Sequence, residues 1–200
     1  MTQKHQKLIV GVTGATGMVY AMRVLEVLRT LSIETHLVVT KPADMTIAYE
    51  ARNDPRKLRE LADAVYPIND LGAAIASGSF KTNGMIVVPC SVRSLAEIAT
   101  GVTTNLLTRA ADVCLKERRR VVLAVRETPL HAGHLKNMLA ATEMGAVIAP
   151  PVPAFYTQPD SVADIVDHTV GRLLDLFDIE SGLVSRWDGK APAARAEADS

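Results

Sequence analysis

The chain has few cysteines, few aromatic residues and no excess of charge of either sign. Its two cysteines, Cys90 and Cys114, exclude a disulfide framework and cannot form a zinc site by themselves. Its 22 basic side chains are balanced by 22 acidic ones, so no overall field attracts nucleic acid or an anionic membrane. We therefore expect that any anion bound by this protein is held by a local cluster of groups.

The N-terminal region also lacks a long apolar run, since residues 8–12 are too short a stretch for a signal peptide or a membrane span. We expect a cytoplasmic protein that binds neither membrane nor nucleic acid. A length of 200 residues with 48% hydrophobic residues fits one α/β domain that can bury a core. We place this domain at residues 1–187, and we expect the tail at 188–200, rich in Ala, Pro and charge, to be poorly ordered.

Short, continuously apolar runs alternate with helical patterns along the chain. The runs predict strands at residues 7–12, 35–39, 85–88 and 121–125, with a short fifth at 146–148. Apolar residues at helical spacing follow the first strand, and further helices are predicted at 55–64, 94–100, 104–117, 131–142 and 160–177. Continuous hydrophobicity is typical of strands covered on both faces, so we predict an α/β sandwich with a mainly parallel sheet between helices.

The residues that follow each strand indicate the site, because ligands of an open parallel sheet bind beyond the carboxyl ends of its strands. The first strand leads into GVTGATG at residues 11–17, whose glycines permit close backbone approach and whose helix offers free N–H groups to a phosphate. The same turn is compatible with a tight connection that binds nothing. The second strand ends in Thr40 and Lys41 without the acidic residue that grips a dinucleotide ribose, which favours a mononucleotide such as FMN.

The next two strand ends carry polar side chains as well. Ser91 and Ser94 open a helix, where they cap it, bind a phosphate or do both. Arg126 and Glu127 follow the fourth strand and lie at the rim of the sheet, either as an ion pair or as ligand contacts. We interpret Cys90 as a buried small residue rather than a nucleophile, because no histidine is adjacent in the sequence.

Cations on two predicted helices allow two interpretations each. Arg109, Asp112 and Lys116 share one helical face, which is either solvated, with an Asp112–Lys116 ion pair, or a local anion site. Arg172 lies beside the apolar stripe of its helix, and it either extends to solvent or binds an anion in a pocket. The Pro-rich residues 150–156 form either a connector or an arm over a pocket or a neighbouring subunit.

Seven motifs occur in order between residues 8 and 187. They are GVTGATG (11–17), ETHLVVTK (34–41), SGSF (77–80), GMIVVPCS (84–91), LLTRAADVCLKERR (106–119), RETPL (126–130) and PPVPAFY (150–156). In these motifs the chain resembles the flavin prenyltransferases of the UbiX type, including the small B subunits of phenolic-acid decarboxylase systems. The resemblance covers nearly the whole chain.

The resemblance implies a three-layer α/β/α sandwich, flavodoxin-like or Rossmann-like, that binds FMN and uses no metal. It implies transfer of a dimethylallyl group from dimethylallyl phosphate to N5 and C6 of reduced FMN. The product, prenylated FMN, is the cofactor of UbiD-type decarboxylases of quinone biosynthesis or aromatic-acid breakdown. The family also implies a large homo-oligomer, such as a dodecamer, with sites at subunit contacts.

The resemblance assigns roles to individual residues. FMN contacts are expected from Gly14, Ala15, Thr16, Thr40, Ser91, Val92, Arg93, Ser94 and Arg126. Contacts to the prenyl phosphate are expected from Ser77, Arg109, Lys116, Tyr156 and Arg172. Glu50 and Glu127 are expected to move protons, and Thr16 is grouped with them as catalytic.

The chemistry of the implied reaction fits these residue types. Cleavage of an allylic C–O bond places charge on the departing phosphate, and Arg109, Lys116 and Arg172 stabilise such charge without a metal. Glu127 is a candidate general acid/base. We hypothesise that Phe80, together with Tyr156 and the flavin, stabilises a developing allyl cation by cation–π contact.

Two other functions remain open. A flavin-dependent cysteine decarboxylase has a similar fold, but it needs a catalytic histidine after the Gly-rich region and a reactive C-terminal cysteine. No cysteine follows Cys114, which counts against this function. A non-catalytic flavin carrier or assembly subunit has no need of phosphate-binding residues, so their presence counts against that function too.

Overall fold

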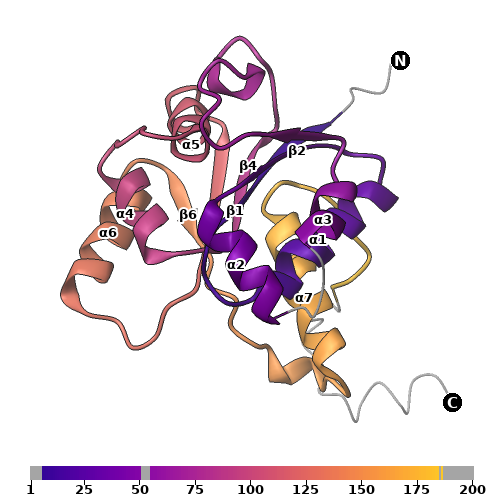
Figure 1. Cartoon of the computed structure of the whole chain (residues 1–200). Helices are drawn as coiled ribbons and strands as arrows, with labels where there is room; N and C mark the ends of the chain where they lie inside the picture. The colour runs from indigo at the N-terminus through magenta and orange to yellow at the C-terminus, as the bar shows by residue number, and fades with distance from the viewer. Residues whose placement is uncertain (1–5, 51–54, 185, 187–200) are drawn as a thin grey trace, which may run out of the picture.

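The computed structural model describes residues 6–50, 55–184 and 186. In these residues six parallel strands form one sheet, in the order β3-β2-β1-β4-β5-β6 (Figure 1). The strands are β1 (Lys7–Val12), β2 (Glu34–Val39), β3 (Ala64–Tyr66), β4 (Gly84–Cys90), β5 (Arg120–Val125) and β6 (Ala146–Ile148). The predicted sandwich with a parallel sheet is confirmed, and the tail predicted at 188–200 lies outside the described residues.

Helices cover both faces of the sheet. They are α1 (Met18–Thr30), α2 (Lys41–Glu50), α3 (Pro55–Glu60), α4 (Val92–Ala99), α5 (Leu106–Lys116), α6 (Ala132–Glu143) and α7 (Val162–Asp175), with short 3₁₀ helices η1 (Ala74–Ala76) and η2 (Phe155–Thr157). Helices α1, α2, α3 and α7 lie on one face, and α4, α5 and α6 lie on the other (Figure 1).

The core consists of two apolar clusters separated by the sheet. Along β1, Leu8 and Val10 point into the cluster beneath α1 and α7, whereas Ile9 points into the cluster beneath α4 and α5. Successive side chains of a strand face opposite sides, so a strand buried on both faces needs apolar residues at every position. This requirement explains why the strands are visible in the sequence as unbroken apolar runs.

Two elements escaped sequence prediction, and one prediction was wrong. Strand β3 has three residues at the sheet edge and is only partly buried, so it has no continuous apolar run. Helix α2 buries only Ala43 and Ile47, which leaves a weak helical pattern. The helix predicted at 55–64 ends at Glu60, and Ala64 already belongs to β3, because the chain must turn to pair with β2.

The strand order locates a crevice. From β1 the chain adds β2 and β3 on one side, and then it crosses to add β4, β5 and β6 on the other. The helix after β1 covers one face and the helix after β4 covers the opposite face, so the two connections diverge from neighbouring strand ends. Ligands of open α/β sheets bind at this reversal.

A buried polar cluster lies at the opposite, amino-terminal end of the strands. The His36 side chain is almost fully buried, with Nδ1 at 3.0 Å from the Tyr66 hydroxyl and Nε2 at 3.0 Å from Glu34 Oε1. Lys7 Nζ donates to the same carboxylate oxygen at 2.9 Å. Burial lowers the pKa of His36, and this effect outweighs the opposite effect of Glu34.

The lowered pKa of His36 predicts that stability falls with falling pH. The unfolded imidazole takes up a proton near pH 6.5, whereas the folded one stays neutral to lower pH, so acidification through that range favours unfolding. One such proton contributes a slope of at most about 1.4 kcal/mol per pH unit. Urea unfolding between pH 7.5 and 5.5 measures how the free energy of unfolding changes with pH. His36→Gln should make this pH dependence weaker.

His168→Gln is the comparison variant. Burial also lowers the pKa of His168, so its removal measures a second contribution to the pH dependence of stability. A His36→Gln variant that keeps the wild-type slope while His168→Gln loses it would contradict the assignment to His36.

Candidate functional site

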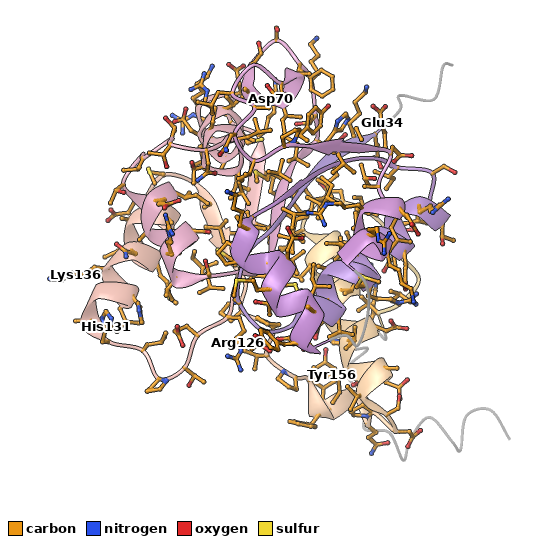
Figure 2. All side chains as sticks on the ribbon, in the orientation of Figure 1. Glu34, Asp70, Arg126, His131, Lys136 and Tyr156 are labelled. Carbon is orange, nitrogen blue, oxygen red and sulfur yellow. The ribbon has the colours of Figure 1, made fainter. Side chains whose placement is uncertain are left out.

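A cavity of about 560 Å³ lies at the carboxyl ends of β1, β2, β4 and β5. All nine residues expected to contact FMN line it, namely Gly14, Ala15, Thr16, Thr40, Ser91, Val92, Arg93, Ser94 and Arg126, and Glu127 lines it as well. Figure 2 shows Arg126 at the end of the sheet opposite Glu34, which begins β2. The fold therefore brings the four predicted strand ends together around one space.

Six further residues line the cavity that were not among the expected site residues. They are Lys41, Pro42, Ile68, Asn69, Glu97 and Asn105. Lys41 directly follows Thr40 and was visible as a charge at a strand end. Ile68 and Asn69 follow the edge strand β3, which has no apolar pattern, and Glu97 and Asn105 enter the wall only because α4 lies against the start of α5.

The start of helix α4 forms one wall of the cavity. Ser91 is its N-cap, and the Ser91 Oγ accepts from the Ser94 backbone N–H at 3.3 Å and donates to the Ser94 hydroxyl at 3.2 Å. The first N–H groups of a helix lack partners within the helix and carry partial positive charge. This end of α4 can therefore bind a phosphate, in addition to being capped by Ser91.

Gly14 permits the wall opposite α4. A Cβ atom on Gly14 would collide with the Cβ of Pro42 in the first turn of α2. Any larger residue would push α2 away from the loop after β1. The glycine is thus required by close packing of two backbone segments next to the cavity.

Thr13 joins the two strand ends beneath the cavity, a role that sequence reasoning missed. This side chain is buried, and its Oγ1 donates to the Pro89 carbonyl at 2.8 Å while it accepts from the Ser91 N–H at 2.7 Å. The bond ties the end of β1 to the N-cap of α4. In the sequence, the only indication of this role is that Thr13 lies inside the GVTGATG motif.

Two observations show that the cavity suits a polar, anionic ligand. The buried hydroxyl of Thr40 has no hydrogen-bond partner within the described part of the chain, although buried hydroxyl groups usually have one. Among the same residues, the side chains of Arg126 and Lys41 form no hydrogen bond or ion pair. Glu127 does not pair with Arg126, because its Oε1 accepts from the Thr128 N–H at 2.9 Å.

Glu50 lies at the start of α1 rather than in the cavity wall. Its carboxylate accepts from the N–H groups of Gly17 and Met18, each at 2.9 Å. A negative charge is favourable there because of the helix dipole. The N–H groups of Gly17 and Met18 are thus already occupied by a carboxylate of the chain itself.

The five residues expected to bind the prenyl phosphate line two other surfaces. Three of them lie beside η1 and α5. Arg109 donates to the Ala76 carbonyl at 3.3 Å and to Asp112 at 2.7 Å. Lys116 Nζ lies 2.6 Å from Glu117, and the hydroxyl of Ser77 lies 2.9 Å from that of Ser79. On α7, Arg172 pairs with Asp175 at 2.8 Å, and the Tyr156 hydroxyl lies 3.5 Å from His168 Nε2. Because α5 and α7 cover opposite faces of the sheet, one chain does not bring the two groups together.

These contacts decide between interpretations that the sequence left open. Asp112 pairs with Arg109 and not with Lys116. Arg172 extends to solvent from the edge of the apolar stripe, with 54% of its side chain exposed. In both cases the cation is paired with a carboxylate of its own helix.

Phe80 does not line the cavity of its own chain, so the role hypothesised for it stays a prediction. Its ring lies at the amino-terminal end of β1, where Lys7 Nζ is 5.0 Å from the ring centroid and the His36 ring is 5.0 Å away. Within the chain, the cation over Phe80 is therefore Lys7. The ring is at the wrong end of the strands to contact a group in the cavity.

The cysteines behave as packing residues. Cys90 and Cys114 are both buried, and burial raises the pKa of Cys90 to about 12 and that of Cys114 to about 11. Thiols with such pKa values stay protonated at neutral pH and are poor nucleophiles. Among the described helices, none is long and apolar enough to cross a membrane.

Fold and site together define a nucleotide-binding α/β protein whose cavity suits a phosphate at a helix end. A family model described as Flavoprotein matches residues 1–180 of this chain. The flavin prenyltransferase UbiX of Neisseria meningitidis is 53% identical over 186 residues, which cover 93% of this chain and 98% of that protein. The chain therefore belongs to the family of UbiX flavin prenyltransferases.

Solved structures agree with this placement. A crystal structure of AnUbiX (PadA1) in complex with FMN and dimethylallyl pyrophosphate has a TM-score of 0.92 and 52% identity, covering 94% of this chain and all of that one. A dodecameric FMN-dependent UbiX-like decarboxylase from Escherichia coli O157:H7 has a TM-score of 0.90 and 49% identity, covering 92% of this chain and all of that one. The cysteine decarboxylase TvaF is 15% identical with a TM-score of 0.63, a likeness of fold alone.

The Thr13 bridge predicts a stability effect. Thr13→Val keeps the shape but leaves the Ser91 N–H without its buried acceptor and the Pro89 carbonyl with only the Thr13 backbone N–H at 3.3 Å, which should lower the free energy of unfolding by about 1–3 kcal/mol. Thr13→Ser retains the hydroxyl and should stay closer to wild type. Urea unfolding of both variants measures the effect, and equal stability of wild type and Thr13→Val would show that the bridge contributes nothing.

Proposed function

We propose that the cavity binds reduced FMN and that the protein transfers a dimethylallyl group from dimethylallyl phosphate to N5 and C6 of the flavin. The product, prenylated FMN, would serve a UbiD-type decarboxylase. The convergence of all nine expected FMN contacts on one cavity is the observation that carries this proposal. The UbiX relatives at about half identity over nearly the whole chain support it.

Different residues of the cavity would bind different parts of FMN. The open N–H groups at the start of α4, with Ser91 and Ser94, would hold the flavin phosphate, and Arg126 would add a positive charge. The unpartnered hydroxyl of Thr40 would bond a polar atom of the ligand. The reduced flavin supplies the nucleophilic atoms of the reaction.

Three basic groups expected to stabilise the leaving phosphate lie outside the cavity of their own chain. Arg109, Lys116 and Arg172 stabilise a phosphate well, but each lies on an outer surface and pairs with a carboxylate. We therefore propose that assembly of several chains brings these groups to the cavity of a neighbour. The dodecameric UbiX-like relative supports this view.

The Pro-rich arm also favours contacts between subunits. Val152 and Phe155 are 72% and 70% exposed, and Tyr156 beside them is 52% exposed. Apolar side chains grouped on a surface mark contact sites with another protein. An arm that lies on a neighbouring chain would carry Tyr156 towards that chain, as its expected role in phosphate binding requires.

The activity is tested with the purified protein, reduced FMN and dimethylallyl phosphate under anaerobic conditions. Mass spectrometry should detect flavin heavier by one prenyl unit, and a parallel reaction with the pyrophosphate identifies the preferred donor. Glu127→Gln should slow turnover by roughly a hundredfold, as loss of a general acid/base does. Arg172→Ala should slow it as well, whereas Lys136→Met on the exposed side of α6 should not.

A wild-type protein that binds FMN but forms no heavier flavin would contradict the prenyltransferase and favour a flavin carrier. Wild-type turnover in both Glu127→Gln and Arg172→Ala would contradict the roles of these residues. The reactions of the two variants are compared at equal flavin content, so that a loss of FMN binding is not counted as a loss of chemistry.

The sharing of sites between subunits is tested by mixing two inactive variants. A chain with Glu127→Gln and a chain with Lys116→Ala are co-expressed with different tags, and assemblies that contain both are isolated. If a cavity uses Lys116 of a neighbour, about a quarter of the sites in a random mixture combine two intact residues and regain activity. If each site uses its own Lys116, every site keeps one defect and the mixture stays inactive.

A further inference from the structure

Glu97 places a carboxylate in the wall of a cavity that suits an anion. It lies on α4, and only 18% of its side chain is exposed. Its Oε1 accepts from Arg93 Nε at 2.9 Å, and its Oε2 accepts from Asn105 Nδ2 at 3.4 Å. Both oxygens are thus engaged, and Glu97 links α4 to the residue that begins α5.

Arg93 occupies an unfavourable position in its helix. It is the second residue of α4, where the helix dipole disfavours a positive charge. A basic residue four positions before an acidic one is also the weaker orientation of such a helical pair. With 82% of its side chain exposed, Arg93 gains little from packing. An anion bound at the same helix end would make this position more favourable.

The contact with Glu97 leaves the two terminal nitrogens of the Arg93 guanidinium available to bind a ligand. Glu97 binds Nε, and within the described residues the terminal nitrogens Nη1 and Nη2 of Arg93 have no partner. Two such nitrogens match two oxygens of a phosphate. The carboxylate also offsets the charge of Arg93 while the cavity is empty, which lowers the cost of keeping a cation at that end of α4.

We infer that Glu97 is a positioning residue for the flavin phosphate, acting through Arg93. It holds the guanidinium by Nε in the wall of the cavity and leaves both terminal nitrogens available to the phosphate, and it holds Asn105 in place so that the walls from α4 and α5 move together. The inference rests on the proposed binding of FMN at this site.

A purely structural role of Glu97 makes a different prediction. Asn105 is the N-cap of α5, where its Oδ1 accepts from the Thr108 N–H at 3.0 Å. If Glu97 only supported this cap, its loss would weaken every flavin ligand to the same extent. If it acts through Arg93, its loss weakens a ligand with a phosphate and spares one without.

The experiment compares FMN with riboflavin, which lacks the phosphate, by quenching of flavin fluorescence. Glu97→Ala should weaken FMN binding roughly fivefold, as expected when a partly exposed ion pair no longer orients a phosphate contact. Riboflavin binding should change less than about twofold. Glu97→Gln keeps an acceptor oxygen for Arg93 Nε and should restore most of the affinity. Glu60→Ala, an exposed carboxylate on α3, is the control and should change neither ligand.

A double-mutant cycle with Arg93→Met completes the test. In the Arg93→Met background, Glu97→Ala should cause no further loss of FMN affinity, because its effect passes through the guanidinium. An equal loss for FMN and riboflavin, a loss that persists without Arg93, or tighter FMN binding by Glu97→Ala would each overturn the inference. A wild-type protein that binds neither flavin would instead overturn the proposed function itself.

Discussion

The rest of the structure depends on the divergence of β1 and β4, two neighbouring parallel strands whose following helices cover opposite faces of the sheet. This divergence opens a crevice at the carboxyl ends of the strands, where the first N–H groups of a helix face outward. The Thr13 hydroxyl holds the two strand ends together beneath it. This bond adds to the pairing of β1 with β4 and to the hydrogen bond from the Thr13 backbone N–H to the Pro89 carbonyl at 3.3 Å.

Local charge, not net charge, governs how this protein can bind an anion. The chain is neutral overall, and several cations in its described part pair with nearby carboxylates, as Arg109 does with Asp112 and Arg172 with Asp175. In the cavity, the side chains of Lys41 and Arg126 are unpaired among the described residues, and the guanidinium of Arg93 is only partly engaged. A bound phosphate therefore meets cations that compete little with internal partners.

The site residues that could be predicted are those that directly follow a strand in the sequence. Thr40, Ser91 and Arg126 each come one position after the end of an apolar run, and parallel strands place those ends along one edge. Glu97 and Asn105 could not be predicted in the same way, because they meet only through the packing of α4 against α5. Strand β3 and helix α2 were missed for a related reason, since each buries too few side chains to leave a pattern.

The sequence by itself determined the parallel sandwich, because strands buried on both faces must be apolar throughout, and it determined those residues of the cavity that adjoin strand ends. Tertiary structure decided the partners of the charged groups. It paired Asp112 with Arg109, placed Phe80 over Lys7 at the far end of the strands, and set Arg172 and Lys116 on opposite sides of the sheet. The contact of Lys7 with Phe80 depends on a distance of a few ångströms between segments far apart in the chain, which no local pattern encodes. On α5 the spacing allowed Asp112 more than one cationic neighbour, and the side-chain conformations decided between them.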